Sequence, residues 1–200
     1  MRARLIFIVV IAFAIGGLSA LLLRGAVPSS TQLSTGKALI GGPFTLTNQD
    51  GQTVTEKDFL GKYMMVVFGY TFCPDICPTE LGLMTEALNK LGEKAKRVTP
   101  VFITIDPKRD TVEQVKSYIS SFHPSMVGLT GTEEQIKQAA SAYRVYYAQA
   151  DGETKSDAYL MDHSTFMYLI SPQGDYVTHF GYGISPDELT QRLDKAIPSG

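Results

Sequence analysis

The strongest constraint on the fold of this chain is a cysteine pair that lies between an apolar run and a helical pattern. Cys73 and Cys77 are the only two cysteines in the sequence. Residues 63–68 before them are nearly all apolar, and a helical pattern runs from Pro78 to about Lys94. This order places sulfur at a helix N-terminus, where free N–H groups and the helix dipole stabilise a thiolate. The pair is therefore expected to serve chemistry or a crosslink.

Strand and helix signals alternate along the rest of the chain. Before the thiol loop, the sequence predicts a hairpin around Asn48–Gly51 and a helical turn capped at Thr55. After it, we expect strands at 98–105, 126–129, 165–170 and 176–180, with helices starting at Asp110 or Thr111, at Thr132 and at Ser185. Residues 146–161 have no clear period, and a connection of this length is often a functional loop.

The order of these elements predicts an α/β protein with a thioredoxin-like fold. Strand–helix–strand is followed by strand–strand–helix, with a thiol at the end of the first strand. A mixed sheet with helices on both faces follows from this order. The N-terminal hairpin and the 126–129 strand are additions to that arrangement.

An apolar run near the N-terminus predicts a membrane anchor. Residues 5–23 carry no charge, and this length approaches the roughly 20 residues that span a bilayer. The run exceeds the core of a cleaved signal peptide, and its Arg flanks favour an N-terminus inside. We expect an uncleaved anchor at 1–24, a tether at 25–40 and one domain at 41–200. Because only four residues precede the run, a single-pass protein of the bacterial inner membrane with a periplasmic domain is expected.

Charge and cysteine usage narrow the function. Apart from Arg2, Arg4 and Arg24 the chain has fifteen basic and twenty acidic residues, which argues against a nucleic-acid partner. In an oxidising periplasm two lone cysteines form a disulfide unless they are reduced or metal-bound.

The spacing of Cys73 and Cys77 leaves a disulfide and a metal site open. On one helical turn their Cβ atoms lie about 5–6 Å apart, whereas a relaxed disulfide needs about 3.5–4.5 Å. A metal bound at about 2.3 Å from each sulfur tolerates the wider spacing better. Pro74 weakens this argument if it lets Cys73 sit outside the helix.

His163 is the candidate third ligand. It directly precedes the 165–170 strand, at the junction where thioredoxin-like folds usually carry a cis-proline; the corresponding residue here is Ser164. Two thiolates and one imidazole form a soft set that suits copper, as Cu(I) or Cu(II), although zinc also uses two Cys and one His. His123 and His179 are expected to be structural.

Three motifs resemble those of the Sco/SenC family. They are Phe68–Pro78 with Cys73 and Cys77, Thr104–Thr111 with the sequence TIDPKRDT, and Asp162–Ser164 with His163. The resemblance implies a copper metallochaperone, rather than an enzyme, that serves the dinuclear copper centre of cytochrome c oxidase. It also implies Cys73, Cys77 and His163 as copper ligands. The implied partners are the copper-centre subunit of the oxidase and an upstream periplasmic copper donor or thiol reductant.

The sequence departs from the family pattern at Phe72, where many members have a polar residue, often histidine. Asp106 and Arg109 are interpreted as a loop-ordering ion pair, and Asp110 as a helix cap. Asp162 is a candidate to orient His163, although neighbours in an extended chain point opposite ways. Tyr159 and Met161 are interpreted as packing residues.

Two other functions use the same thiols. A thiol–disulfide reductase would keep the oxidase's copper-binding cysteines reduced through a redox-active Cys73–Cys77 pair. A peroxidase is suggested by the resemblance of Cys77–Leu81 to a peroxidatic loop. The residues three and seven positions before Cys77, Pro74 and Tyr70, do not match that pattern.

Overall fold

The computed structural model describes residues 39–150 and 159–198. The predicted anchor at 1–24 and nearly all of the tether at 25–40 lie outside the described residues. Within the described ranges, no helix combines the length and the apolar character needed to cross a membrane.

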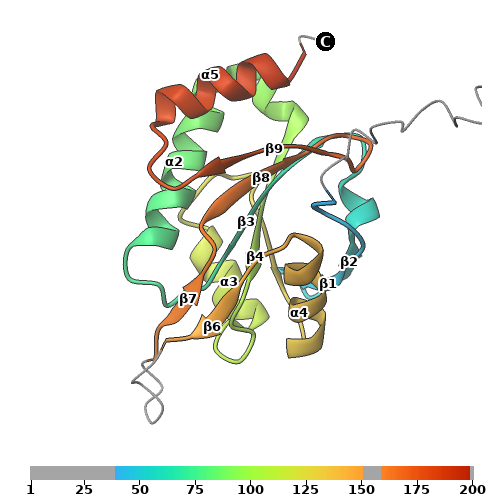
Figure 1. Ribbon diagram of the computed structural model, residues 1–200, viewed down its shortest axis with the longest axis vertical. Helices are drawn as coiled ribbons and strands as arrows, with labels where there is room; N and C mark the ends of the chain where they lie inside the picture. The colour runs from blue at the N-terminus through green and yellow to red at the C-terminus, as the bar shows by residue number, and fades with distance from the viewer. Residues whose placement is uncertain (1–38, 151–158, 199–200) are drawn as a thin grey trace, which may run out of the picture. The chain divides into compact units, whose positions relative to one another are not determined.

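A seven-stranded mixed sheet forms the centre of the domain (Figure 1). Its strand order is β2-β1-β5-β4-β3-β8-β9. The central strand β3 pairs in parallel with β4 and antiparallel with β8. The strands are β1 (Thr45–Asn48), β2 (Thr53–Thr55), β3 (Tyr63–Gly69), β4 (Val98–Thr104), β5 (Val127–Thr130), β8 (Phe166–Ile170) and β9 (Tyr176–Gly181).

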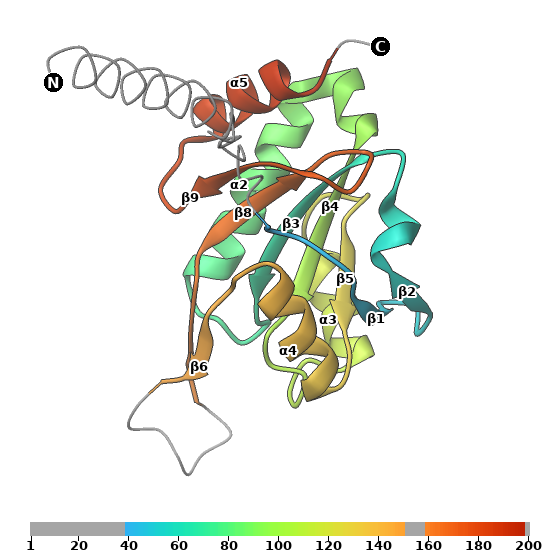
Figure 2. The same ribbon diagram turned by 45° about the vertical axis from the view of Figure 1, so that its right-hand side comes forward.

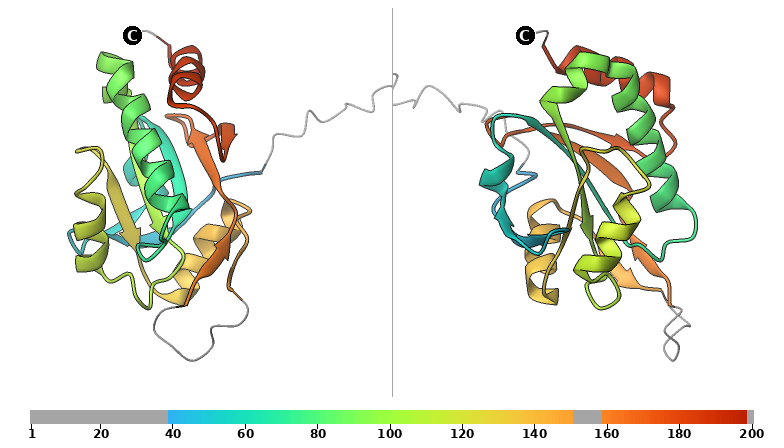
Figure 3. Two further views of the ribbon diagram at one scale, coloured as in Figure 1. Left: turned by 90° about the vertical axis from the view of Figure 1, so that its left-hand side faces the viewer. Right: turned by 180° about the vertical axis from the view of Figure 1, so that it is seen from behind.

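Helices cover both faces of this sheet because its central strands are apolar on both sides (Figure 3). Met65 and Val67 of β3 pack with α2 (Ile76–Leu91), α3 (Val112–Ile119) and α5 (Pro186–Ala196). Met64 and Val66 alternate with them and face the other core, which includes residues of α4 (Glu133–Ala142). Two short 3₁₀ helices, η1 (Glu56–Phe59) and η2 (Gly92–Arg97), complete these elements.

Three of the predicted helix starts are confirmed by their caps. Thr55 and Asp58 form a capping box at η1, and Thr132 and Gln135 form one at α4. Ser185 caps α5, with proline in its first turn. The described residues therefore adopt the predicted thioredoxin-like α/β fold, with the expected β1–β2 hairpin at its start.

The expectation that residues 146–161 lack regular structure was wrong at both ends of that segment. β6 (Tyr147–Gln149) and β7 (Met161–His163) form a two-stranded antiparallel sheet in which Tyr147 pairs with His163 (Figure 2). Strands of three residues are too short to show an alternating pattern, so the pairing was invisible in the sequence. Residues 151–158 between them lie outside the described residues.

Helix α2 begins at Ile76, two residues before the predicted start. Cys77 therefore lies in the first turn of the helix, and Cys73 lies in the loop before it. The geometry of two cysteines on one helical turn does not apply to this pair.

Candidate metal centre

The thiol loop places the two sulfurs in different environments. Cys77 is fully buried under the sheet, whereas Cys73 is partly exposed. The backbone N–H of Cys77 donates to Sγ of Cys73 at 3.4 Å. This contact is the predicted placement of sulfur at a helix N-terminus, where an N–H group stabilises a thiolate. The two cysteines are not joined by a disulfide in the structure.

Strand β7 brings His163 against the thiol loop. Its Nε2 atom lies 3.5 Å from Sγ of Cys77. Its Nδ1 atom lies 2.9 Å from the backbone carbonyl of Ser164, an acceptor, so we assign the proton to Nδ1. In the neutral imidazole, the lone pair of Nε2 therefore faces the thiol loop, which is the orientation that a ligand needs. The ring of Tyr70 packs edge-on against the imidazole, with the ring centres 6.2 Å apart.

The structure thus brings all three predicted site residues to one region. Among the residues that the structure describes, no set of three or more His, Cys, Asp or Glu side chains is arranged so that it could hold a metal ion. Cys73, Cys77 and His163 are therefore neighbours, but their side chains are not placed as metal ligands in this structure.

The two thiols have opposite acidities. A hydrogen bond from the Cys77 thiol, followed by the interaction with His163, lowers the pKa of Cys73 to about 3 despite the opposing effect of burial. The same bond to Cys73, together with burial, raises the pKa of Cys77. Cys73 is therefore the thiolate and Cys77 holds the proton.

The pKa of His163 is also perturbed. Burial by itself lowers it, but the interactions with Cys73 and with the Ser164 carbonyl outweigh burial and raise the pKa of the imidazole. In the imidazolium form Nε2 also carries a proton, and a metal ion bound at Nε2 would displace it, because a ligating nitrogen must be deprotonated.

A buried carboxylate next to these groups was missed by sequence reasoning. Glu80 lies one helical turn after Cys77 and is 2% exposed. Neither of its carboxylate oxygens has a hydrogen-bond partner among the described residues. Burial raises the pKa of Glu80 to about 7, while the charge of His163 opposes that rise. Nothing in the sequence marks this residue as buried; only its helical spacing from Cys77 could have pointed to it.

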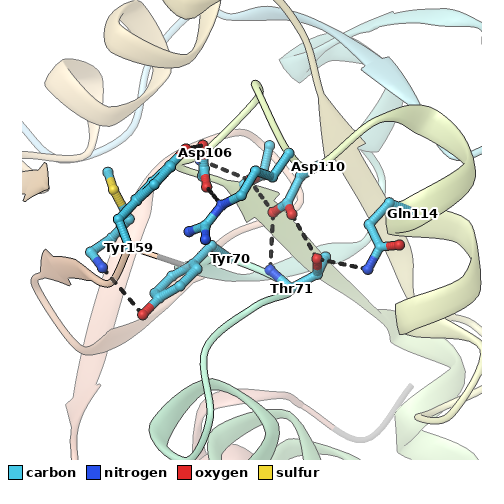
Figure 4. Close-up of polar contacts among 9 residues, drawn as sticks. Tyr70, Thr71, Asp106, Asp110, Gln114 and Tyr159 are labelled. Atoms are coloured by element: carbon cyan, nitrogen blue, oxygen red, sulfur yellow. Dashed lines mark hydrogen bonds and ion pairs between the residues drawn. The ribbon is translucent and has the colours of Figure 1, made fainter. Parts of the chain in front are cut away.

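The Asp106–Asp110 segment lies beside the thiol loop (Figure 4). The predicted ion pair is confirmed, since Nε of Arg109 donates to Asp106. Of the two residues predicted to cap the next helix, Thr111 is the cap of α3 and accepts from Gln114 N–H, so the interpretation of Asp110 as the cap was wrong. Asp110 instead accepts hydrogen bonds from Thr71 and Thr104, because its side chain points back toward the sheet.

Apart from Asp162, the other residues considered in the sequence have structural roles in packing or hydrogen bonding. Asp162 is exposed, and the Ser164 carbonyl orients His163 in its place. Met161 packs against the core as expected, whereas Tyr159 also donates its hydroxyl to Asp106 at 2.7 Å. His123 contacts Ser125, and His179 contacts Tyr176, so both are structural as predicted.

Comparison with known proteins identifies the family of this chain. The SCO1/SenC family model matches residues 32–198. A curated relative, "Protein SCO1 homolog 1, mitochondrial" of Arabidopsis thaliana, is 50% identical over 165 residues, which cover 82% of this chain and 49% of the relative. The chain therefore spans about half the length of that relative.

Solved structures share the fold. Arabidopsis thaliana ScoI with copper bound has 48% identity and a TM-score of 0.74, and the match covers 79% of this chain and 98% of that one. BsSco, described as a member of the Sco family of cytochrome c oxidase assembly proteins with a disulfide switch, has 23% identity and a TM-score of 0.63 over 82% of this chain and 98% of its own. The second match shows the fold alone.

Proposed function

The chain belongs to the SCO1/SenC family, and from this premise we propose that it is a membrane-tethered copper metallochaperone that delivers copper to the dinuclear centre of cytochrome c oxidase. Copper is the cargo of such a protein. Cys73, Cys77 and His163 are the residues proposed to hold it. The plant homologue with copper bound supports the choice of metal.

One observation carries the proposal: Nε2 of His163 lies 3.5 Å from Sγ of Cys77, with its other nitrogen engaged by Ser164. Two sulfurs and one imidazole nitrogen form a soft donor set, which favours copper over harder ions. Cys73 is partly exposed at the edge of the site. A recipient's ligand would therefore approach from the side of Cys73, while Cys77 stays buried.

The test is a copper titration of the reduced full-length chain. We expect one tightly bound copper per chain, and weaker binding after Cys73→Ser, Cys77→Ser or His163→Ala. His179→Ala is the matched control, since that imidazole bonds to Tyr176 and lies outside the site. Binding that is indifferent to His163 would contradict the proposed ligand set.

A thiol–disulfide reductase is the second candidate, and the unequal acidities of the two thiols favour it as an auxiliary activity. The Cys73 thiolate would attack a disulfide of the target and form a mixed disulfide. The Cys77 sulfur would then attack Cys73 and release the target dithiol, leaving a Cys73–Cys77 disulfide and two electrons on the target. A thiol reductant would restore the pair. The imidazole contributes to this exchange only by helping to lower the pKa of Cys73, so His163→Ala should cause a mild loss.

The membrane location is proposed from the sequence. Residues 1–24 would form an uncleaved single-pass anchor in a bacterial inner membrane, residues 25–40 a tether, and residues 41–200 the periplasmic domain. Retention of the chain in the membrane pellet after an alkaline wash, together with an intact N-terminus by mass spectrometry, would support this. Release of a shortened soluble chain would contradict it.

A further inference from the structure

The thiol loop is anchored to the Asp106–Asp110 segment through Thr71, two residues before Cys73. The backbone N–H of Thr71 donates to Oδ2 of Asp110 at 3.0 Å, and its hydroxyl donates to Oδ1 at 2.6 Å. Gln114 of α3 donates to the same hydroxyl at 3.0 Å. Asp110 is fully buried, so this end of the loop is fixed to the interior (Figure 4).

The strands β6 and β7, with Tyr159 just before β7, form the hairpin that carries His163, and this hairpin is also anchored to the Asp106–Asp110 segment. Tyr159 donates its hydroxyl to Oδ1 of Asp106 at 2.7 Å. The backbone N–H of Met161 donates to the hydroxyl of Tyr70 at 3.2 Å. Both halves of the proposed site therefore rest on one short stretch between β4 and α3, although they lie far apart in the sequence.

Arg109 joins the two halves directly. Its guanidinium carbon lies 3.6 Å from the ring centre of Tyr159, on the hairpin, and 4.8 Å from that of Phe72, on the thiol loop. Its Nε donates to Asp106, and its side chain is only 12% exposed. A guanidinium at these distances from aromatic faces is attracted by the ring electrons, and burial strengthens that attraction.

We propose that Arg109 is a positioning residue of the metal centre, whose guanidinium clamps Tyr159 to Phe72 and so holds His163 beside the two thiols. This inference deepens the proposed function and rests on its ligand set. It assigns a role to Phe72, a residue that the sequence left without one. Phe72 is 48% exposed, and its ring supplies the loop side of the clamp.

The planar guanidinium is the feature to test. Arg109→Lys keeps the positive charge beside Asp106 but lacks the flat face that stacks on two rings. Phe72→Leu keeps an apolar side chain of similar size on the loop but has no ring electrons. Because Phe72 is half-exposed, this second variant tests the clamp even if Arg109→Lys fails to fold.

The first measurement uses the metal-free full-length chain. Hydrogen exchange of the Met161 amide reports the hairpin position, since that amide bonds to Tyr70. We expect either variant to speed this exchange by roughly 3–30-fold. The second measurement is Cu(I) affinity by competition with a chromophoric chelator, which we expect to fall by about 10–100-fold in Arg109→Lys.

Arg192→Lys is the matched control. Arg192 belongs to α5, and its guanidinium carbon lies 4.8 Å from the ring centre of Phe180. This distance equals that between the guanidinium carbon of Arg109 and the ring centre of Phe72. The same substitution there should leave both the Met161 exchange and the copper affinity unchanged. An equal effect of both lysine variants would overturn the clamp, because it would report general destabilisation.

The outcomes separate the clamp from the proposed function. A wild-type chain that binds no copper refutes the copper site, while the exchange of Met161 still decides whether Arg109 holds the hairpin. Unchanged Met161 exchange and unchanged affinity in both Arg109→Lys and Phe72→Leu would refute the clamp with the copper site intact.

Discussion

Sγ of Cys77 and Nε2 of His163 lie 3.5 Å apart, although 86 positions separate them in the sequence. The sulfur comes from the first turn of α2 and the nitrogen from the short strand β7. The sheet brings them together because β3, which leads into the thiol loop, pairs with β8, which follows β7.

The backbone behind Cys77 leaves no room for a methyl group. A Cβ on Gly69 would lie 2.8 Å from Sγ of Cys77 and 3.2 Å from Phe102. Gly69→Ala should therefore push the sulfur out of position, destabilise the fold by about 1–3 kcal/mol and weaken copper binding. Gly82→Ala, on helix α2 with Cys77, is the control: nothing lies within 4 Å of its added Cβ, so a gain of about 0.5–1 kcal/mol is expected. Unfolding in urea followed by circular dichroism measures both; a neutral Gly69→Ala contradicts the close approach.

Cys73 should be the more reactive thiol in the metal-free chain. Because the Cys77 thiol lowers the pKa of Cys73 to about 3, Cys73 is a thiolate throughout the range from pH 5 to 8. Its alkylation rate should change little over that range. The alkylation rate of an ordinary thiol with a pKa of about 8.5, by contrast, falls roughly tenfold for each unit by which the pH is lowered. Cys77→Ala removes the donor and should restore a pH-dependent rate. The rate of labelling by iodoacetamide, resolved for each cysteine by peptide mapping, measures this difference. Faster labelling of Cys77 would refute the assignment of Cys73 as the thiolate.

Glu80 should make the metal-free fold less stable as the pH rises. Its folded pKa of about 7 lies above its ordinary value of 4.5. The folded chain therefore binds more protons between these values, and stability falls from pH 4.5 to about 7. The total loss is about 3 kcal/mol at 1.36 kcal/mol per pKa unit.

Glu80→Gln is neutral at every pH and nearly the same shape. Its advantage in unfolding free energy over the wild-type chain should be absent near pH 4.5, grow toward pH 7 and stay constant above it. Urea unfolding of both chains at several pH values provides the comparison. An advantage that is the same at pH 4.5 and pH 8 would show that the carboxylate is not buried without a partner.

The hydroxyl of Thr71 should support the thiol loop. Thr71→Val removes the 2.6 Å bond to Asp110 and the acceptor for Gln114, so a loss of about 1–3 kcal/mol is expected. Thr190→Val is the control, because that hydroxyl bonds only to a carbonyl of its own helix, that of Pro186, among the hydrogen bonds described. Its loss should stay below about 0.5 kcal/mol. Equal stability losses in the two variants would show that Asp110 does not anchor the loop.

The sequence alone determined the elements of the main sheet, the helices that cover it and the candidate ligands, but not the short strands β6 and β7. The apolar run before Cys73, the caps at Thr132 and Ser185, and the order of strands and helices predicted the fold, because these signals are local and act within a few residues. The two cysteines and His163 were found by residue type and by position relative to those elements.

Only the tertiary structure decided how the site is held. The Ser164 carbonyl that orients His163 has no side-chain signature, and the partnerless burial of Glu80 depends on what packs around it. The stack of Arg109 on Phe72 and Tyr159 joins three segments whose distances along the chain carry no pattern. Such contacts are set by strand register and packing between elements, and these are properties of the folded chain as a whole.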